Sequence, residues 1–283
     1  MPDPTDPTDP TDPTPALDLP PDLSSARAEL LREVVRRNDA AHGADLLGVV
    51  LSGSAARGMA THRSDLDVYV VLGDEAAAGR STVRSRALDE VPLSLSELEH
   101  VPTFGSDGWW YRWSFAWAPV VLDRTGGRLA ALVGAQAAVS PAETLEILVD
   151  HDRLDGWLNY AYRSLKSDRD GRSLERRLDA AESVPWLLDT VFSLAGRVRP
   201  YHKYLPWELE RHPVPGWPAA VLLDLVERTL DGDPAAVRET YSRVVADCRR
   251  FDASLAEPVL LPVVEDWGEE LEVLGPVGDR AGW

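Results

Sequence analysis

The apolar positions of the chain change their spacing near residue 140. Before that point they form short runs of strand length, and we predict strands at 45–52, 66–72 and 91–95. Helices are predicted around these runs, at about 24–38, 54–59 and 74–88. The pattern indicates an α/β domain.

Aromatic rings occupy alternate positions in residues 109–122, at Trp109, Tyr111, Trp113, Phe115 and Trp117. A strand places alternate side chains on one face, so we predict a fourth, long strand with an aromatic face. Such a face either packs under a helical layer or lines a pocket for a nucleobase or sugar.

After Pro141 the apolar residues recur with a period of about 3.6, which is typical of helices. The predicted helices are 142–168, 173–199, 218–231, 234–254 and about 262–274. We therefore expect a domain boundary near 138–142. It divides an α/β domain, residues 23–140, from an all-helical domain, residues 141–283.

Composition adds a tail and a charge to this picture. Residues 1–22 begin with a Pro-Asp-Thr repeat that has almost no apolar side chains, and we predict a disordered tail. Six aspartates lie in this tail without any Lys or Arg, so the rest of the chain carries −12 of the net charge of −18. Such a balance argues against broad nucleic-acid binding, which depends on Lys and Arg at phosphates. It suits a cationic partner.

The chain has neither an apolar run long enough to span a bilayer nor a basic-then-apolar leader, so we expect a cytoplasmic protein without a membrane partner. Cys248 is the only cysteine, which excludes an internal disulfide and a cysteine-based zinc site.

Candidate chemistry lies in LGVVLSGSAARGMATHRSDLDVYVVL, residues 47–72. The first strand ends at Gly53-Ser54, ten residues follow, and Asp65 and Asp67 open the next strand. The two carboxylates point to the same side of the strand, and their repulsion is relieved when a cation lies between them. Mg²⁺ prefers carboxylate oxygens together with substrate phosphates. A glycine at a strand-to-helix turn lets the backbone approach a phosphate. The segment therefore predicts a Mg-NTP site, with Gly53 and Ser54 at the phosphates.

Gly53-Ser54, the ten-residue gap and Asp65-Leu66-Asp67-Val68 resemble the signature of the DNA polymerase beta-type nucleotidyltransferase superfamily. The two-part layout is most similar to its small bacterial members, which include the aminoglycoside and lincosamide nucleotidyltransferases. The resemblance implies a mixed sheet flanked by helices, bound Mg²⁺, and transfer of a nucleoside monophosphate from an NTP to a hydroxyl.

The superfamily has a third carboxylate on a neighbouring strand. Asp89 is the first candidate, because it begins the next strand after Asp67. Glu90 would face the opposite side, so only one of the two can point at the metals. Asp123 is the remaining candidate, although an aspartate in VVLDRTGG is also typical of a turn. The third carboxylate would bind metal, accept the proton of the substrate hydroxyl, or both.

The helical half offers a second element, RVRPYHKYLPWELERHPVPGW, residues 197–217. Lys203 could reach a triphosphate, and Tyr201 or Tyr204 could stack on a base or sugar. The alternative is a rigid connector whose rings complete the core. Asn159, Arg163 and Lys166 form one polar stripe on helix 142–168, either solvated or facing the cleft between the halves.

We therefore expect a Mg-dependent transferase that uses ATP or another NTP. Its expected acceptor is a small hydroxylated molecule, such as an aminoglycoside-like antibiotic. A protein-modifying (AMPylating) enzyme and a regulatory nucleotide-binding protein of the same fold are the alternatives.

Overall fold

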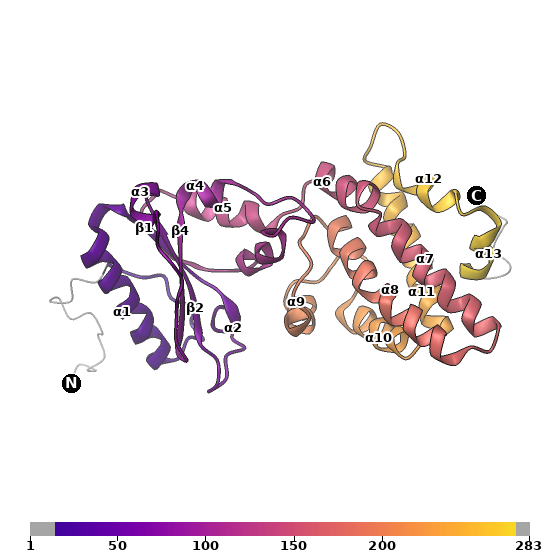
Figure 1. The fold of residues 1–283 in the computed structure, drawn as a ribbon, viewed down its shortest axis with the longest axis horizontal. Helices are drawn as coiled ribbons and strands as arrows, with labels where there is room; N and C mark the ends of the chain where they lie inside the picture. Colours follow the sequence, from indigo (N-terminus) through magenta and orange to yellow (C-terminus); the bar gives the residue numbers. More distant parts are fainter. Residues whose placement is uncertain (1–14, 276–283) are drawn as a thin grey trace, which may run out of the picture. The chain divides into compact units, whose positions relative to one another are not determined.

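The computed structural model describes residues 15–275, and within them the chain forms two compact units. The first unit contains the chain up to Pro102 together with Ser114–Ala137, and the second contains Thr103–Trp113 and the residues from Ala138 onward. The chain therefore enters the second unit for a short stretch before it returns to complete the first (Figure 1).

The first unit is built on a mixed sheet that has five strands within residues 15–275, in the order β3-β4-β2-β1-β5. Strands β2 and β4 are parallel, and the other neighbours are antiparallel. The strands are β1 Leu46–Leu51, β2 Leu66–Leu72, β3 Val83–Arg84, β4 Leu88–Ser94 and β5 Val120–Asp123. The strands predicted at 45–52 and 66–72 are confirmed. The strand predicted at 91–95 begins earlier, at Leu88, and so includes Asp89 and Glu90.

Helices cover both faces of this sheet (Figure 1). Helix α1, Ser25–His42, buries Leu31, Val34 and Val35 against one face. Helices α4, Leu95–Glu99, and α5, Arg128–Ala137, bury apolar side chains against the other. Alternate positions of β2 supply the two faces, since Val68 and Val70 belong to the α1 side and Tyr69 and Val71 to the α4–α5 side.

The last part of the predicted N-terminal tail is ordered. Residues 15–22, which we predicted to be disordered, lie against the α1 side of the sheet: Leu17 and Leu19 pack on its core. The backbone N–H of Asp18 donates to the carbonyl of Val121 at 3.0 Å. Two leucines and one backbone hydrogen bond repay the ordering of this stretch. Residues 1–14, which carry the repeat, lie outside the described residues.

The long aromatic strand predicted at 109–122 is wrong. Trp109–Phe115 forms a 3₁₀ helix, η2, and only Val120–Asp123 is a strand. The five alternate rings do not share one buried face, since Tyr111 and Trp117 are exposed while Arg112 and Ala116 between them are buried with Trp109, Trp113 and Phe115. Because large rings stand at nearly every position here, two periods fit the sequence, and packing selects the helical one.

The helix predicted at 74–88 is also mostly wrong. Helix α3 covers only Asp74–Ala77, and Val83–Arg84 forms the short edge strand β3. Gly79 lies just after the helix with φ +72°, a backbone conformation that ends a right-handed helix.

The second unit is helical, and its long helices α7, α8 and α11 pack along one another (Figure 1). Each of the five predicted ranges is helical in the structure, but several are shorter or interrupted, and η4 and α9 lie in a stretch where no helix was predicted. Residues 141–169 break at Asp152, which has φ +54°. The helices are α6 Pro141–Leu145, the π-helix η3 Glu146–Asp150, α7 Arg153–Arg169, α8 Ser173–Leu194, η4 His202–Tyr204, α9 Leu205–Arg211, α10 Ala219–Leu230, α11 Pro234–Asp252, α12 Leu260–Glu265, η5 Gly268–Glu270 and α13 Leu271–Leu274.

The predicted fold class, a mixed α/β sheet domain joined to a helical domain, is confirmed. Across residues 15–275, each helix is too short or too polar to cross a bilayer.

Candidate metal centre

Three carboxylates meet at one end of the sheet. Strands β2 and β4 run parallel in a register that places Asp67 opposite Asp89. Asp65 precedes Asp67 by two residues, just before β2 begins. Each of the three side chains offers one oxygen atom, and these oxygens lie within 4.8 Å of one another. All three residues are half-buried, so the cluster is open to a ligand from solvent.

Asp89 of this cluster has an ion pair within the first unit. Arg84 on the edge strand β3 lies with its Nε 3.2 Å from Oδ2 of Asp89, but the Arg84 side chain is 75% exposed. An ion pair so open to water is weak. Three oxygen donors at this spacing are the ligand set that a hard divalent cation such as Mg²⁺ prefers. The residues therefore fit a magnesium ion.

The turn after β1 packs directly against this cluster. The N–H of Ser52 donates to the carbonyl of Asp67 at 2.9 Å. Gly53 follows with φ +63°, and a Cβ atom there would lie 1.7 Å from Oδ2 of Asp67. A side chain at position 53 would occupy the place of the carboxylate, so glycine is required by space as well as by backbone conformation. Ser54 is next and is 3% exposed.

Arg57 anchors this turn, and the sequence analysis missed it. The side chain is buried at the end of α2, Gly53–Ala56, and its Nη1 donates to the carbonyl of Gly53 at 2.7 Å. Its Nη2 donates to the carbonyl of Ala116 at 2.7 Å. One guanidinium thus joins the Gly53 turn to the segment before β5. The sequence does show an arginine four residues after Gly53. Its neighbours in sequence do not distinguish a buried arginine that anchors a turn from a solvated one.

Glu90, the second candidate for the third carboxylate, faces the other side of the sheet. Its carboxylate accepts hydrogen bonds from Arg37 and from Nδ2 of Asn38, both on α1. Its residue is 8% exposed, so Glu90 is a structural partner of α1.

Asp123, the third candidate, lies at the far end of the sheet. It pairs with Gly48 near the beginning of β1, whereas Gly53 follows the end of that strand. Its Oδ1 accepts from the backbone N–H of Thr125 at 2.7 Å and from the Thr125 hydroxyl at 2.6 Å. Burial alone would raise the pKa of Asp123, but these hydrogen bonds outweigh it and hold the pKa below its ordinary value. Asp123 is therefore a turn residue.

The segment 197–217 belongs to the second unit, and its rings and Glu208 complete the core of that unit. Tyr204 stacks on Trp113 with ring centroids 4.8 Å apart, and the hydroxyl of Tyr201 donates to the carbonyl of Trp110 at 2.6 Å. Glu208 is 1% exposed and accepts from Nε1 of Trp113 and from Arg197. These contacts favour the connector interpretation. Lys203 lies on the surface of this segment, with its Nζ 4.9 Å from the centre of the Tyr204 ring.

Two cations of the predicted polar stripe on α7 have partners within the helical unit. Nε of Arg163 lies 3.3 Å from Oδ1 of Asp179 on α8, and Nζ of Lys166 lies 4.9 Å from the ring centre of Tyr162. Arg163 therefore links α7 to α8, and Lys166 packs on a ring of its own helix. These contacts favour the solvated-face interpretation of the stripe.

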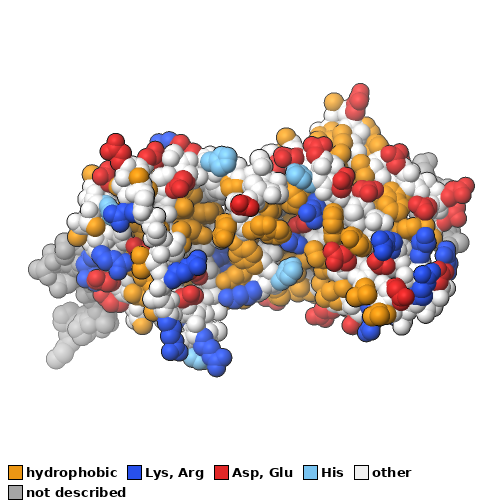
Figure 2. Space-filling view, viewed as in Figure 1, with side chains coloured by type: hydrophobic (Ala, Val, Ile, Leu, Met, Phe, Trp, Pro, Cys, Tyr) orange, Lys and Arg blue, Asp and Glu red, His pale blue; other side chains and the backbone are white. Residues whose placement is uncertain are grey.

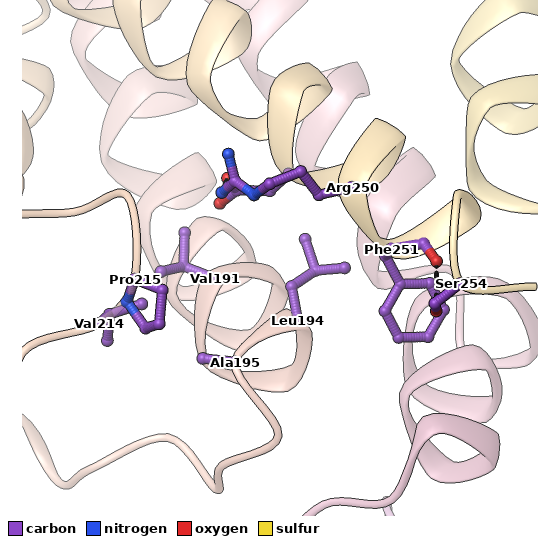
Figure 3. A pocket seen from close by; sticks show the side chains of 9 residues that line it. Val191, Leu194, Ala195, Val214, Pro215, Arg250, Phe251 and Ser254 are labelled. Atoms are coloured by element: carbon purple, nitrogen blue, oxygen red, sulfur yellow. Dashed lines mark hydrogen bonds and ion pairs between the residues drawn. The ribbon is translucent and has the colours of Figure 1, made fainter.

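The helical unit also contains a mainly apolar cavity of about 270 Å³. Figure 3 shows Val191, Leu194, Val214 and Phe251 around it, with the Arg250 side chain on one side. Arg250 forms an ion pair with Asp247, which also accepts from Nε1 of Trp217 at 2.6 Å. The lining includes Val214 from the segment 197–217, but not Lys203, Tyr201 or Tyr204.

Comparison with known proteins adds little to this geometry. No protein-family model matches the chain, and no curated protein matches it. A crystal structure of a nucleotidyltransferase-like protein from Exiguobacterium sibiricum 255-15 is similar over 86% of this chain and 78% of that chain, with a TM-score of 0.36 and 13% sequence identity. A likeness of this degree does not identify a function, which depends on the chemistry of the carboxylate cluster and its turn.

Proposed function

We propose that this protein is a Mg²⁺-dependent nucleotidyltransferase that transfers a nucleoside monophosphate from an NTP, with ATP the first choice, to a hydroxyl group. The observation that carries the proposal is the cluster of Asp65, Asp67 and Asp89 at the edge of the Gly53 turn. The carboxylates can hold a divalent cation, and the glycine turn beside them lets backbone atoms come close to phosphate oxygens. This combination suits a metal-bound triphosphate better than a metal ion without a nucleotide.

Each residue has a role in this proposal. Asp65 and Asp67 hold the metal, and Asp89 holds it or accepts the proton of the attacking hydroxyl. The Gly53-Ser54 turn lies along the phosphates, and Arg57 keeps that turn in place through the carbonyl of Gly53. When bound, Mg²⁺ neutralises charge on the phosphate oxygens and orients them.

The reaction is a single displacement at phosphorus. The acceptor oxygen forms a bond to the α-phosphorus, the bond from that phosphorus to the pyrophosphate oxygen breaks, and the hydroxyl proton leaves to a carboxylate or to water. Little covalent chemistry is required of the protein, so positioning and electrostatic stabilisation supply most of the rate.

For the acceptor we propose a small, cationic, hydroxylated molecule of the aminoglycoside type, in the cytoplasm. Its support is the net charge of −18. On the face shown in Figure 2, acidic and basic side chains are interspersed over the helical unit. A protein hydroxyl is the alternative acceptor, and an NTP-binding regulator without turnover is the alternative function. Lys203 is retained as a candidate triphosphate contact within this proposal.

The decisive experiment measures pyrophosphate release from ATP, GTP, CTP and UTP with Mg²⁺, in the presence of a panel of aminoglycosides and neutral polyols. The test variant is Asp67→Ala, and the matched control is Glu90→Gln, which removes a carboxylate from the opposite face of the neighbouring strand. We expect release by the wild type and by Glu90→Gln, and loss of at least a hundredfold in Asp67→Ala. ATP binding without release for any acceptor would support the regulatory alternative, and absence of Mg-ATP binding would refute the proposal.

A further inference from the structure

Trp117 combines a strained backbone with an exposed ring. It is one of two non-glycine residues with positive φ within residues 15–275, at +59°, and it is 44% exposed. A bulky side chain at positive φ is an outlier that a glycine would relieve. Such outliers persist where the surrounding structure enforces them, often at ligand sites.

The segment just before Trp117 lies on the face of the sheet that carries the carboxylates. Phe115, two residues earlier, stacks on Tyr69 with ring centroids 4.7 Å apart and an interplanar angle of 28°. Tyr69 follows Asp67 by two residues on β2, so the two side chains share a face. The chain from Phe115 to Trp117 therefore starts directly above the strand that bears Asp67.

The same neighbours place Trp117 at the carboxylate end of the sheet. The N–H of Leu51, at the end of β1, donates to the carbonyl of Pro119 at 3.0 Å. Arg57 donates to the carbonyls of both Ala116 and Gly53. The backbone of Trp117 is therefore tied through one guanidinium to the turn that touches Asp67.

The segment of Trp117 lies within a nucleotide's reach of the cluster. Strand β1 lies between β5 and β2, so Pro119 beside β1 is roughly 10 Å from the strand of Asp67, and Trp117 lies in the chain between Pro119 and Phe115. A nucleotide whose phosphates lie at the Gly53 turn is long enough to bring its base to this segment.

We propose that the indole of Trp117 is the stacking surface for the nucleobase of the NTP. This inference rests on the proposed function and extends it to the base. Stacking on an indole depends little on the identity of the base, because every base has a π-face. The ring itself should therefore not discriminate among the four common NTPs, and a preference for ATP would come from other contacts.

The test compares binding of two probes by calorimetry in Mg²⁺: a non-hydrolysable α,β-methylene analogue of ATP, and inorganic tripolyphosphate, which has no base. Trp117→Gly removes the ring at a position whose positive φ a glycine adopts without strain, so the variant keeps the backbone conformation of this segment. We expect it to lose on the order of tenfold to a hundredfold in affinity for the analogue and to keep its affinity for tripolyphosphate. Trp117→Phe should restore most of the lost affinity.

The outcomes separate the two proposals. Equal weakening of both probes in Trp117→Gly, or no weakening of either, would overturn the stacking role and leave the proposed function intact. Weaker binding of an aminoglycoside with unchanged binding of the analogue would assign the ring to the acceptor and would also overturn it. If neither the wild type nor Asp67→Asn binds either probe, both proposals are overturned.

Discussion

Gly53 and Asp67 occupy one space in this protein: a Cβ atom on Gly53 would lie 1.7 Å from Oδ2 of Asp67 and 2.6 Å from its carboxyl carbon. Gly53 follows the end of β1 and Asp67 lies on the adjacent strand β2, and the N–H of Ser52 joins the turn to β2 at the carbonyl of Asp67. The backbone of the turn thus forms one wall of the carboxylate cluster. Any ligand bound to Asp67 meets main-chain atoms there.

Gly53→Ala should therefore have two effects: strain in the backbone at position 53 and displacement of the Asp67 side chain. The side chain forces Asp67 to move, and we expect Mg-nucleotide affinity to fall at least tenfold. Gly79→Ala is the matched control, because Gly79 also has positive φ, +72°, but a Cβ atom there has nothing within 4 Å. Both variants lose about 1–2 kcal/mol of stability through the left-handed conformation. Equal effects of the two variants on nucleotide binding would contradict the role of Gly53.

Asp67→Asn should abolish the response of the protein to Mg²⁺. The variant replaces one of three carboxylates whose oxygens lie within 4.8 Å of one another by an amide, which is a poorer ligand for a hard divalent cation. Thermal unfolding with and without Mg²⁺ measures this effect: Mg²⁺ should raise the melting temperature of the wild type and leave that of the variant unchanged. An identical Mg²⁺ response in the two proteins would show that Asp67 is not a ligand.

Glu90→Gln should destabilise the fold and leave Mg²⁺ binding unchanged. The variant loses the charge that faces Arg37 on α1, although the amide can still interact with Asn38. We expect a loss of about 1–3 kcal/mol in the free energy of unfolding, measured with urea, because a buried charged hydrogen bond is weakened. Mg²⁺ binding should stay as in the wild type, and its loss would mean that the face assignment of β4 is wrong.

Asp123→Asn should destabilise the protein in a pH-dependent way. Burial opposes ionisation of Asp123, but hydrogen bonds from Thr125 outweigh it and lower its pKa in the folded state. A carboxyl with a lowered folded pKa stabilises the fold above its unfolded pKa, and this contribution disappears as the pH falls through the folded value. We expect the variant to be about 1 kcal/mol less stable than the wild type near neutral pH. The difference should shrink below about pH 4, in urea unfolding at several pH values.

Cys248 should not react with thiol reagents in the native protein. It is 0% exposed on α11, and burial, reinforced by Asp252 and Asp247, raises its pKa to about 12. The thiolate is the reactive form, so alkylation near pH 8 should require unfolding and should accelerate sharply with denaturant. Rapid labelling without denaturant would show that α11 opens locally.

Local pattern was sufficient for much of this protein. The limits of β2, Leu66–Leu72, follow from a bounded apolar run, and the shared face of Asp65 and Asp67 follows from the period of two. The division into a mixed sheet and a helical region follows from the change of apolar spacing near residue 140. These features depend on neighbours in sequence, which is why the sequence alone determined them.

Tertiary pairing decided the rest. The sequence shows that Asp89 and Glu90 face opposite sides, but only the parallel pairing of β4 with β2 brings Asp89 beside Asp67 and leaves Glu90 to α1. Around Trp113 the rings fit a strand or a helix equally well, and contacts with distant Tyr204 and Glu208 selected the helix. Both choices depend on partners far away in the chain, and the free energy of burying side chains against such partners is absent from any local pattern.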